Sequence, residues 1–91
     1  MKDMSSIRDL VVIADADTET RAALSAALLE SGFQVEAVDS GAMACAAFVE
    51  HGPEIVILNL ELPVQDGLSA CAEIRRLPGG ANIPVILVSD R

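Results

Sequence analysis

The sequence has few aromatic residues and little positive charge, and both shortages exclude classes of protein. Phe33 and Phe48 are its only aromatic residues, so a core must be built from aliphatic side chains. Six basic residues stand against fourteen acidic ones, which gives a formal net charge of −8. Because phosphate contacts require a cationic surface, we expect no nucleic-acid binding by this chain alone.

Cysteines are few, and long apolar runs and phosphate-binding loops are absent from the sequence. Cys45 and Cys71 fall in different predicted helices, without the short spacing of a zinc site or a disulfide framework. No apolar run approaches the ~20 residues of a membrane span, and the N-terminus has no signal-peptide core. The sequence contains neither a P-loop motif nor a GxGxxG turn. We therefore expect a cytoplasmic protein.

The residues that are present, 52% of them hydrophobic, suffice for one small core. Two continuous apolar runs rich in β-branched residues, Leu10–Ala14 and Ile55–Leu58, predict strands buried on both faces. Phe33–Val38 alternates between apolar and polar residues, as a half-exposed edge strand does. Ile83–Val88 predicts a fourth strand.

Helical segments separate these strands. The first, Thr18 to Ser31, has apolar residues at helical spacing and is followed by a glycine, as helices often are. Further helices are predicted over Gly41–Glu50 and from Asp66-Gly67 to Arg75-Arg76. Single helices alternating with strands indicate an α/β domain with a parallel sheet. The apolar positions expected on the first helix are Ala22, Ala23, Ala26, Leu28 and Leu29.

Polar side chains follow the predicted strands. Asp15 and Asp17 come after the first strand, Asn59 and Glu61 after the third, and Ser89 after the fourth. In an open α/β sheet, ligands bind in the crevice beyond the carboxyl ends of the strands. If the chain has a site, Asn59 is therefore the first candidate residue.

In order and spacing, the segments resemble the receiver domains of bacterial two-component response regulators. The sequence ADAD at 14–17 is similar to the acidic turn after the family's first strand, and IPVILVS at 83–89 resembles its fourth strand. Residues 58–67, LNLELPVQDG, resemble the loop that carries the phosphoacceptor. The resemblance implies a flavodoxin-like sheet of order 2-1-3-4 as far as this sequence extends. The loop positions that match the family are Glu61, Pro63, Asp66 and Gly67.

The residues that carry the family's chemistry are partly replaced. In the family, an aspartate ending the third strand accepts a phosphoryl group from a histidine kinase, and two acids after the first strand help to bind Mg²⁺. Here Asn59 holds the acceptor position, and a neutral carboxamide cannot attack phosphorus as a carboxylate does. Ala16 replaces one metal-binding acid, which leaves Asp15 as the only side-chain ligand beside the Glu61 backbone carbonyl. We expect no cofactor, with Mg²⁺ bound weakly at best. Ser89 matches the family's switch hydroxyl.

The resemblance also places Arg91, the last residue, before the family's fourth helix, fifth strand and fifth helix. We therefore expect one receiver-like domain over residues 1–91 that lacks this last part and the lysine it carries. The fourth strand then forms an exposed apolar edge, and such edges pair with other chains. A dimer or higher oligomer is expected, through this edge or the uncovered sheet faces. The alternative is a fragment of a longer protein.

Each candidate residue also has a simpler interpretation. Asn59 can be a strand-end amide that satisfies loop N–H groups. Asp15 and Asp17 can be a helix cap and a solvated acid. Ser89 can be an ordinary terminal hydroxyl, and His51 a surface loop residue.

Three functions from different classes follow from these residues. The first is a non-enzymatic pseudo-receiver, which regulates signal transduction by protein contacts and without phosphorylation. The second is a phosphoacceptor domain that uses another carboxylate, Asp15, Asp17 or Glu61. The third is an enzyme on a similar fold, for which the sequence offers no nucleophile–base pair. We expect the first, with a histidine kinase or an output domain as possible partners besides a second copy of the chain.

Overall fold

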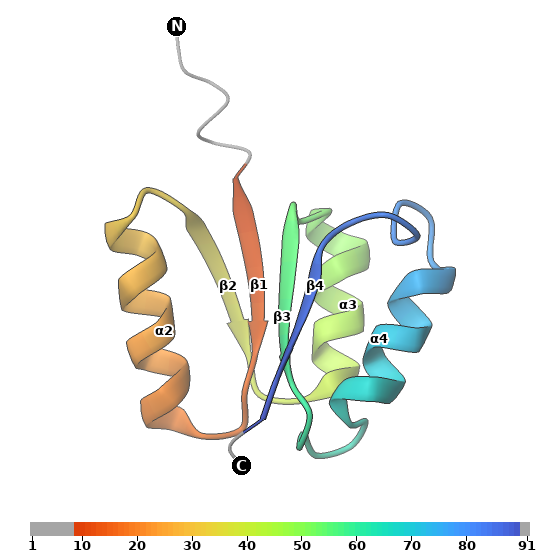
Figure 1. The fold of residues 1–91 in the computed structure, drawn as a ribbon, viewed down its shortest axis with the longest axis horizontal. Helices are drawn as coiled ribbons and strands as arrows, with labels where there is room; N and C mark the ends of the chain where they lie inside the picture. The colour runs from red at the N-terminus through yellow and green to blue at the C-terminus, as the bar shows by residue number, and fades with distance from the viewer. Residues whose placement is uncertain (1–8, 90–91) are drawn as a thin grey trace, which may run out of the picture.

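The computed structural model describes residues 9–89 and shows strands and helices in strict alternation (Figure 1). Residues 1–8 and 90–91, including the Arg91 at which the sequence ends, lie outside the described part. The elements are β1 (Leu10–Ala14), α2 (Thr18–Glu30), β2 (Gln34–Val38), α3 (Gly41–His51), β3 (Ile55–Asn59), α4 (Gly67–Arg76) and β4 (Val85–Val88). All strand pairs are parallel, in the order β2-β1-β3-β4. The predicted flavodoxin-like order is confirmed.

The two central strands form the middle of the core. In β1, residues 11–14 are at most 1% exposed, and Val56 and Leu58 of β3 are fully buried. β-Branched and other aliphatic side chains pack well on a pleated surface that is covered on both sides, which explains why these runs become strands. Because β1 and β3 are paired in register from Val11 with Ile55 to Ala14 with Leu58, their carboxyl ends lie together.

The helices form two layers of unequal packing. Helix α2 lies on one side of the sheet, while α3 and α4 pack together on the other (Figure 1). The α3–α4 layer buries Phe48, Ala44, Ala70 and Ile74 in the core. Helix α2 buries no residue fully. Within residues 9–89, no helix combines the length and apolarity needed to cross a bilayer.

The predicted packing face of α2 is wrong in part. Ala22, Ala23 and Ala26 are exposed, and Leu29 is 56% exposed, whereas the partly buried side includes Leu24 and Leu28. Because alanines occur on both sides of α2, the hydropathy of the sequence does not show which side is buried.

Element boundaries differ from the prediction by one or two residues. Asn59 belongs to β3 itself, and β4 begins at Val85, two residues later than predicted, because the segment before it is irregular. His51 is the exposed last residue of α3 and not a loop residue. Its left-handed C-cap, Gly52 with φ 58°, ends the helix as glycine commonly does.

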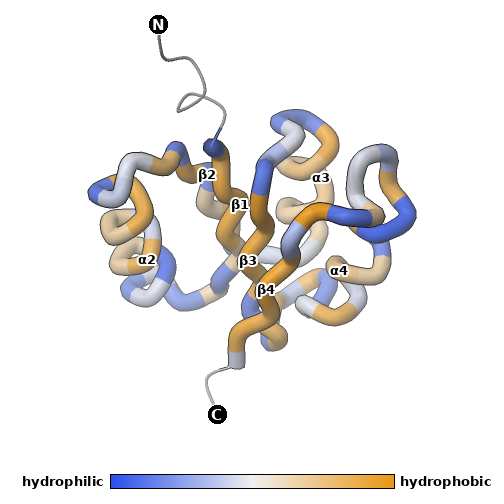
Figure 2. Tube along the Cα trace, turned by 45° about the horizontal axis from the view of Figure 1, so that its top comes forward, coloured by the Kyte–Doolittle hydropathy of each residue, from blue (hydrophilic) through white to orange (hydrophobic). Residues whose placement is uncertain are grey.

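The free edge of the sheet at β4 is strongly apolar. Ile86, Leu87 and Val88 are 49%, 39% and 38% exposed, although all three are large aliphatic residues. Figure 2 shows β4 as an apolar strand at the near side of the domain. The expected exposed apolar edge is therefore present in the described part of the chain.

Substituting Gly41, the first residue of α3, tests how closely the loop between β3 and α4 packs on that helix. A Cβ at Gly41 would overlap the backbone oxygen of Gln65, which cannot move without shifting the loop. We expect Gly41→Ala to lower the free energy of unfolding by about 1–3 kcal/mol, the usual cost of overpacking. Urea unfolding followed by circular dichroism measures it. Ala42→Ser, one added atom at the exposed neighbouring position, is the control and should change stability by less than about 0.5 kcal/mol. Equal effects of the two substitutions would show that the close approach is unimportant.

Candidate functional site

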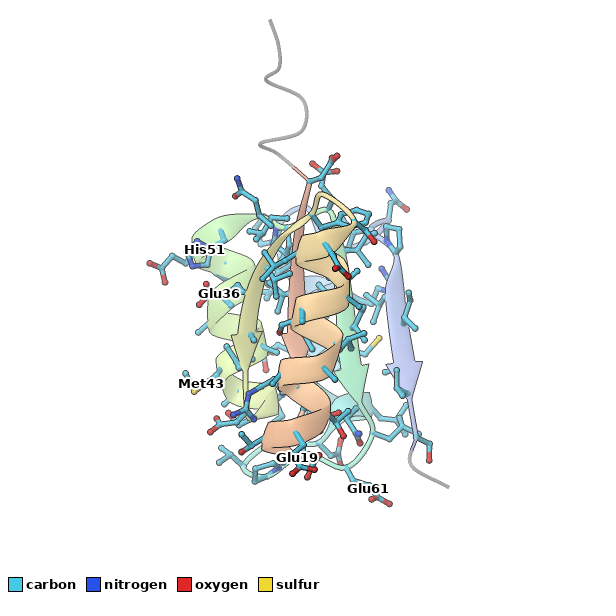
Figure 3. The ribbon with its side chains drawn as sticks, turned by 90° about the vertical axis from the view of Figure 1, so that its left-hand side faces the viewer. Glu19, Glu36, Met43, His51 and Glu61 are labelled. Carbon is cyan, nitrogen blue, oxygen red and sulfur yellow. The ribbon has the colours of Figure 1, made fainter. Side chains whose placement is uncertain are left out.

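The candidate site lies at the carboxyl edge of the sheet, where β1 and β3 end side by side. Asp15 directly follows β1 and Asn59 ends β3. Both side chains are buried, with only 6% and 3% of their surface exposed. Figure 3 shows this end of the domain, with Glu19 from α2 and Glu61 from the loop after β3 at the same end. The parallel pairing thus creates one shared polar position from two distant stretches of sequence.

A hydrogen bond joins the two buried residues. The Asn59 amide nitrogen Nδ2 donates to Asp15 Oδ2 at 3.2 Å. On its other side, Asn59 Oδ1 accepts from the backbone N–H of Glu61 at 2.8 Å, and Asp15 Oδ1 accepts from the N–H of Asp17 at 2.9 Å. A carboxamide can donate and accept at once, which a carboxylate cannot do. Asn59 therefore links the end of β1 to the loop after β3.

The Asp17 side chain caps helix α2, and only the backbone N–H of this residue contacts the buried pair. Its Oδ2 accepts from the backbone N–H of Thr20 at 2.8 Å and from the Thr20 hydroxyl at 2.6 Å, the arrangement of an N-cap. The hydroxyl and then the N–H of Thr20 hold the pKa of the exposed Asp17 carboxyl below its ordinary value. The helix-cap interpretation is therefore the one that the contacts of Asp17 support.

Arg21 is a site residue that the sequence interpretation did not include. From the second turn of α2, its Nη1 donates to the backbone carbonyl of Asp15 at 2.7 Å. The guanidinium thereby ties α2 to the turn between β1 and α2. An arginine one turn into the helix that follows an acidic turn was the available signal.

The loop after β3 is closed by polar contacts around Gln65, which was also missed. Gln65 Nε2 donates to Glu73 Oε1 at 2.8 Å, while its Oε1 accepts a long contact of 3.7 Å from the Cys45 thiol. The same thiol lies 3.7 Å from the carbonyl oxygen of Ala70. These contacts tie the loop to both α3 and α4. No sequence pattern marks a glutamine for this role.

Within that loop, exposed and buried residues alternate sharply. Leu62 is buried, whereas Glu61 and Pro63 are exposed. Val64 is 87% exposed and has a φ of 69°, an unusual backbone conformation for a β-branched residue. The N–H of Gln65 donates to the Pro63 carbonyl at 2.6 Å, which closes the turn around Val64.

The remaining predicted residues shape the site from its periphery. Asp66 caps α4, accepting from the Ser69 N–H at 2.8 Å. Gly67 is buried, and a Cβ there would overlap the carbonyl oxygen of Asn59. Ser89 is exposed and follows Val88, the β4 partner of Asn59 in register. It therefore lies at the same edge of the sheet as the buried pair.

The donor set for a cation at this edge is small. Both Asp15 oxygens already accept hydrogen bonds, Asn59 turns its N–H toward Asp15, and the adjacent position is Ala16. Across residues 9–89, no group of three or more His, Cys, Asp or Glu side chains could hold a metal ion. Mg²⁺ prefers several oxygen ligands in near-octahedral geometry, and the residues present do not fit that requirement.

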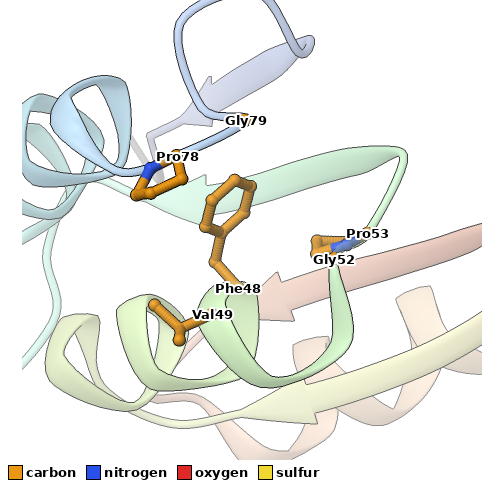
Figure 4. Close-up of a pocket in the computed structure, with 6 residues that line it drawn as sticks. All are labelled: Phe48, Val49, Gly52, Pro53, Pro78 and Gly79. Atoms are coloured by element: carbon orange, nitrogen blue, oxygen red, sulfur yellow. The ribbon is translucent and has the colours of Figure 1, made fainter.

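A separate hollow of about 280 Å³ lies at the opposite, amino end of β3 (Figure 4). It is enclosed between the end of α3 and the turn after α4. No residue that lines it is titratable, so it has no part in the chemistry of the strand-end site. Its lining is Phe48, Val49, Gly52, Pro53, Pro78 and Gly79.

The Asp15–Asn59 hydrogen bond predicts the effect of making residue 59 acidic. Asn59→Asp replaces the donor by a second buried carboxylate about as far from Asp15 as the present 3.2 Å contact. We expect the free energy of unfolding at neutral pH to fall by about 1–3 kcal/mol, as when a buried polar partner is lost. Added Mg²⁺ should recover part of the loss in this variant and leave the unsubstituted chain unchanged. Thermal unfolding with and without Mg²⁺ measures both effects.

A double variant supplies the control for charge alone. Asp15→Asn combined with Asn59→Asp exchanges the two groups and keeps one carboxylate and one amide in the pair. It should regain most of the lost stability without Mg²⁺, because the three hydrogen bonds of the pair can form again. If the double variant is as unstable as Asn59→Asp, the amide–carboxylate bond is not what holds the two strand ends.

The buried thiol beneath the loop predicts a loss of stability at alkaline pH. Burial, together with the Glu73 carboxylate, raises the pKa of Cys45 from 9.0 to about 11. Between these values the unfolded chain loses its thiol proton before the folded chain does, so stability is intact below pH 9 and falls as pH rises toward 11. The chain has no tyrosine and one lysine, so few other groups titrate there.

Melting temperatures measured from neutral pH to above pH 10 test this dependence. Cys45→Ala should flatten the alkaline decline, although its melting temperature at neutral pH is lower. Cys71→Ala, at a partly exposed thiol, should keep the decline. A decline of the same steepness in Cys45→Ala would assign it to another group.

Comparison with known proteins agrees with the geometry. Residues 11–91 match the family of response regulator receiver domains. The chain is 32% identical over 81 residues to the transcriptional regulatory protein PrrA of Mycobacterium tuberculosis, covering 89% of this chain and 34% of PrrA. It is 31% identical over 74 residues to the chemotaxis protein CheY of Bacillus subtilis, covering 80% of this chain and 62% of CheY. The chain thus spans about a third of the length of the transcriptional regulator.

Solved structures show the same architecture. The signal receiver domain of a histidine kinase from Syntrophus aciditrophicus superposes with a TM-score of 0.82 at 28% identity, over 88% of this chain and 61% of that one. The N-terminal domain of a response regulator receiver protein from Methanoculleus marisnigri has a TM-score of 0.84 at 20% identity, over 90% and 67% of the two chains, and shows the fold alone. On its sheet order, its strand-end polar residues and the match over residues 11–91, this chain belongs to the response regulator receiver domain family.

Proposed function

We propose that this receiver domain is a non-enzymatic regulatory module that acts through protein contacts and without phosphorylation. The observation that carries the proposal is the buried hydrogen bond from Asn59 Nδ2 to Asp15 Oδ2, at 3.2 Å. Asn59 stands at the position where members of the receiver family carry the phosphoacceptor carboxylate. An amide there is uncharged, and its nitrogen is directed at the neighbouring carboxylate.

The chemistry of the pair supports this proposal. Phosphoryl transfer to a receiver requires an ionised oxygen as nucleophile, and the oxygen of Asn59 is a neutral acceptor bound to the Glu61 N–H at 2.8 Å. Asp15 is only 6% exposed, and both of its oxygens accept hydrogen bonds within the fold. Neither residue offers an exposed carboxylate oxygen to an incoming phosphoryl group.

The domain is proposed to work without a resident cofactor. Stabilising the charge of a transferring phosphoryl group is a usual role of Mg²⁺. Asp15 is the one side-chain ligand left here, so Mg²⁺ binding is expected to be weak at best. The arginine at position 21 already places a positive charge at the Asp15 carbonyl, 2.7 Å away.

We propose that the partners of the domain are proteins. The proposed location is the cytoplasm. Candidates are a histidine kinase, an output domain or a second copy of the chain. Nucleic acid is not proposed as a ligand of this chain alone, because its net charge is −8. The relatives named as transcriptional regulators are about three times as long as the matched segment, and their activities belong to whole proteins.

Intact-mass spectrometry after incubation with Mg²⁺ and a small acyl phosphate tests the proposal. The unsubstituted chain should keep its mass, because no exposed carboxylate is placed as an acceptor in the pocket. Uptake of a phosphoryl group by the unsubstituted chain would overturn the proposal. Peptide mapping would then identify the modified carboxylate, and Glu61, exposed next to the pocket, is the first to examine.

Variants in the same assay separate a missing acceptor from a wholly altered pocket. If Asn59→Asp gains a phosphoryl group and the unsubstituted chain does not, the pocket has lost only its acceptor. If Asn59→Asp gains none, the residues that would bind Mg²⁺ are inadequate as well. Asn59→Ala is the matched control, because it opens the same position without supplying a nucleophile. Labelling of Asn59→Ala would place phosphate elsewhere and contradict the proposal.

A further inference from the structure

The loop between β3 and α4 contains a strained turn centred on Val64. The N–H of Gln65 donates to the carbonyl of Pro63 at 2.6 Å, across the one residue between them. With a φ of 69° at Val64, this is the γ-turn of positive φ, which is rare and strained. A β-branched residue is an outlier at positive φ, whereas glycine adopts it freely. The turn by itself therefore favours glycine at position 64.

Packing within the domain does not explain the valine either. Its side chain is 87% exposed, the largest fraction among the large hydrophobic side chains of residues 9–89. A side chain so exposed removes little apolar surface from water, so it adds little to the stability of the fold. Backbone strain of this kind clusters at functional sites. A contact with another molecule would account for the valine.

The loop is fixed to the domain on both sides of Val64. Before the turn, Leu62 is only 8% exposed. After it, the Gln65 side chain donates to Glu73 of α4 at 2.8 Å and accepts a long contact of 3.7 Å from the Cys45 thiol of α3. A side chain that is already held in place loses little conformational freedom when it binds. Val64 is therefore presented to solvent in a preorganised position.

The charge around this turn is mainly of one sign. Residues 53–74 contain no Lys, Arg or His, and Glu61 and Asp66 of the same loop are exposed. Figure 3 shows Glu19 of α2 at the same end of the domain as Glu61. Arg21, which also lies at this end, donates to a backbone carbonyl at 2.7 Å. A molecule that contacts Val64 therefore meets a mainly acidic surface, which a basic surface complements.

We propose that Val64 inserts into an apolar socket of a partner protein, and that Lys and Arg side chains of the partner surround this socket. The socket removes the exposed valine from water, and its basic rim faces Glu61 and Asp66. Nucleic acids, anionic membranes and a second copy of the chain are all acidic, so their charge opposes contact at this loop. The inference rests on the proposed role in protein contacts and names the surface that makes them.

Failure of this inference is distinguishable from failure of the proposed function. Phosphate uptake concerns the buried pair at the strand ends, whereas the partner contact uses an exposed side chain of the loop. A chain that gains a phosphoryl group but binds through Val64 would overturn only the absence of phosphorylation. A chain that keeps its mass but binds independently of Val64 would overturn only this inference.

Fluorescence anisotropy with labelled model peptides is the first test. The probe is an amphipathic helical peptide of leucine and lysine, about 18 residues long, and a lysine–serine peptide of equal charge measures charge attraction alone. We expect the chain to bind the leucine–lysine peptide at least about tenfold more tightly than the lysine–serine peptide. A leucine–glutamate peptide should not bind. No preference for the leucine–lysine peptide would overturn the proposal.

Val64→Gly removes the inserted side chain and keeps every charge. It should weaken binding of the leucine–lysine peptide at least about fivefold and leave binding of the lysine–serine peptide unchanged. Because glycine relaxes the turn, the melting temperature should rise by roughly 2–5 °C, which also shows that the variant folds. Val49→Ala, at a 66% exposed valine on α3, is the control and should bind as the unsubstituted chain does. Equal losses of binding in the two variants, or a lower melting temperature of Val64→Gly, would contradict the inference.

Glu61→Gln tests the acidic surroundings of the turn. It should weaken binding of both lysine peptides by about twofold, because it removes one charge beside the contact. Glu54→Gln, just before the amino end of β3, removes the same charge at the opposite end of the strand and should have a smaller effect. Equal effects would show that the peptides do not bind at this loop. Sedimentation completes the test, because self-association that Val64→Gly abolishes would assign the valine to a second copy and overturn the proposal.

Discussion

The parallel pairing of β1 with β3 is the constraint on which the rest of the domain depends. It places Ala14 beside Leu58 and so brings Asp15 and Asn59, which are 44 residues apart, within hydrogen-bonding distance. The buried aliphatic runs drive the pairing, because their side chains are removed from water on both faces. The polar pair is then held by the ends of two rigid strands. Its geometry is a product of core packing more than of the loop around it.

Much of this arrangement could be predicted from the sequence. Continuous apolar runs in β1 and β3, the alternation in β2 and the single helices between them determine a parallel sheet. The polar residues after those strands had to meet at its carboxyl edge, and Asn59 stood out because an amide replaces an expected acid. Strand order came from the resemblance to receiver domains and not from periodicity, which cannot rank neighbours within a sheet.

Other features of the fold and of the site could be seen only in the structure. The alanine-rich α2 has a nearly uniform hydropathy, so its pattern did not show that Leu24 is partly buried while Ala22 and Ala26 are exposed. Arg21 acts through a hydrogen bond to a backbone carbonyl. Gln65 contacts side chains that lie 8 and 20 positions away in the sequence. No local sequence pattern encodes such contacts. The Asp17 side chain was assigned to the pocket because it is acidic, but it accepts a hydrogen bond from the Thr20 N–H instead.

The hydrogen bond from the Leu60 N–H to the Val88 carbonyl, 2.8 Å long, has a consequence for the chemical ageing of the protein. An asparagine deamidates when the following backbone nitrogen attacks its side-chain carbonyl carbon and expels ammonia. Here that nitrogen is the one that joins β3 to β4, and Asn59 is 3% exposed. Spontaneous conversion of residue 59 into an aspartate is therefore suppressed for as long as the two strands remain paired. The same strand pair that extends the sheet also preserves the identity of its central polar residue.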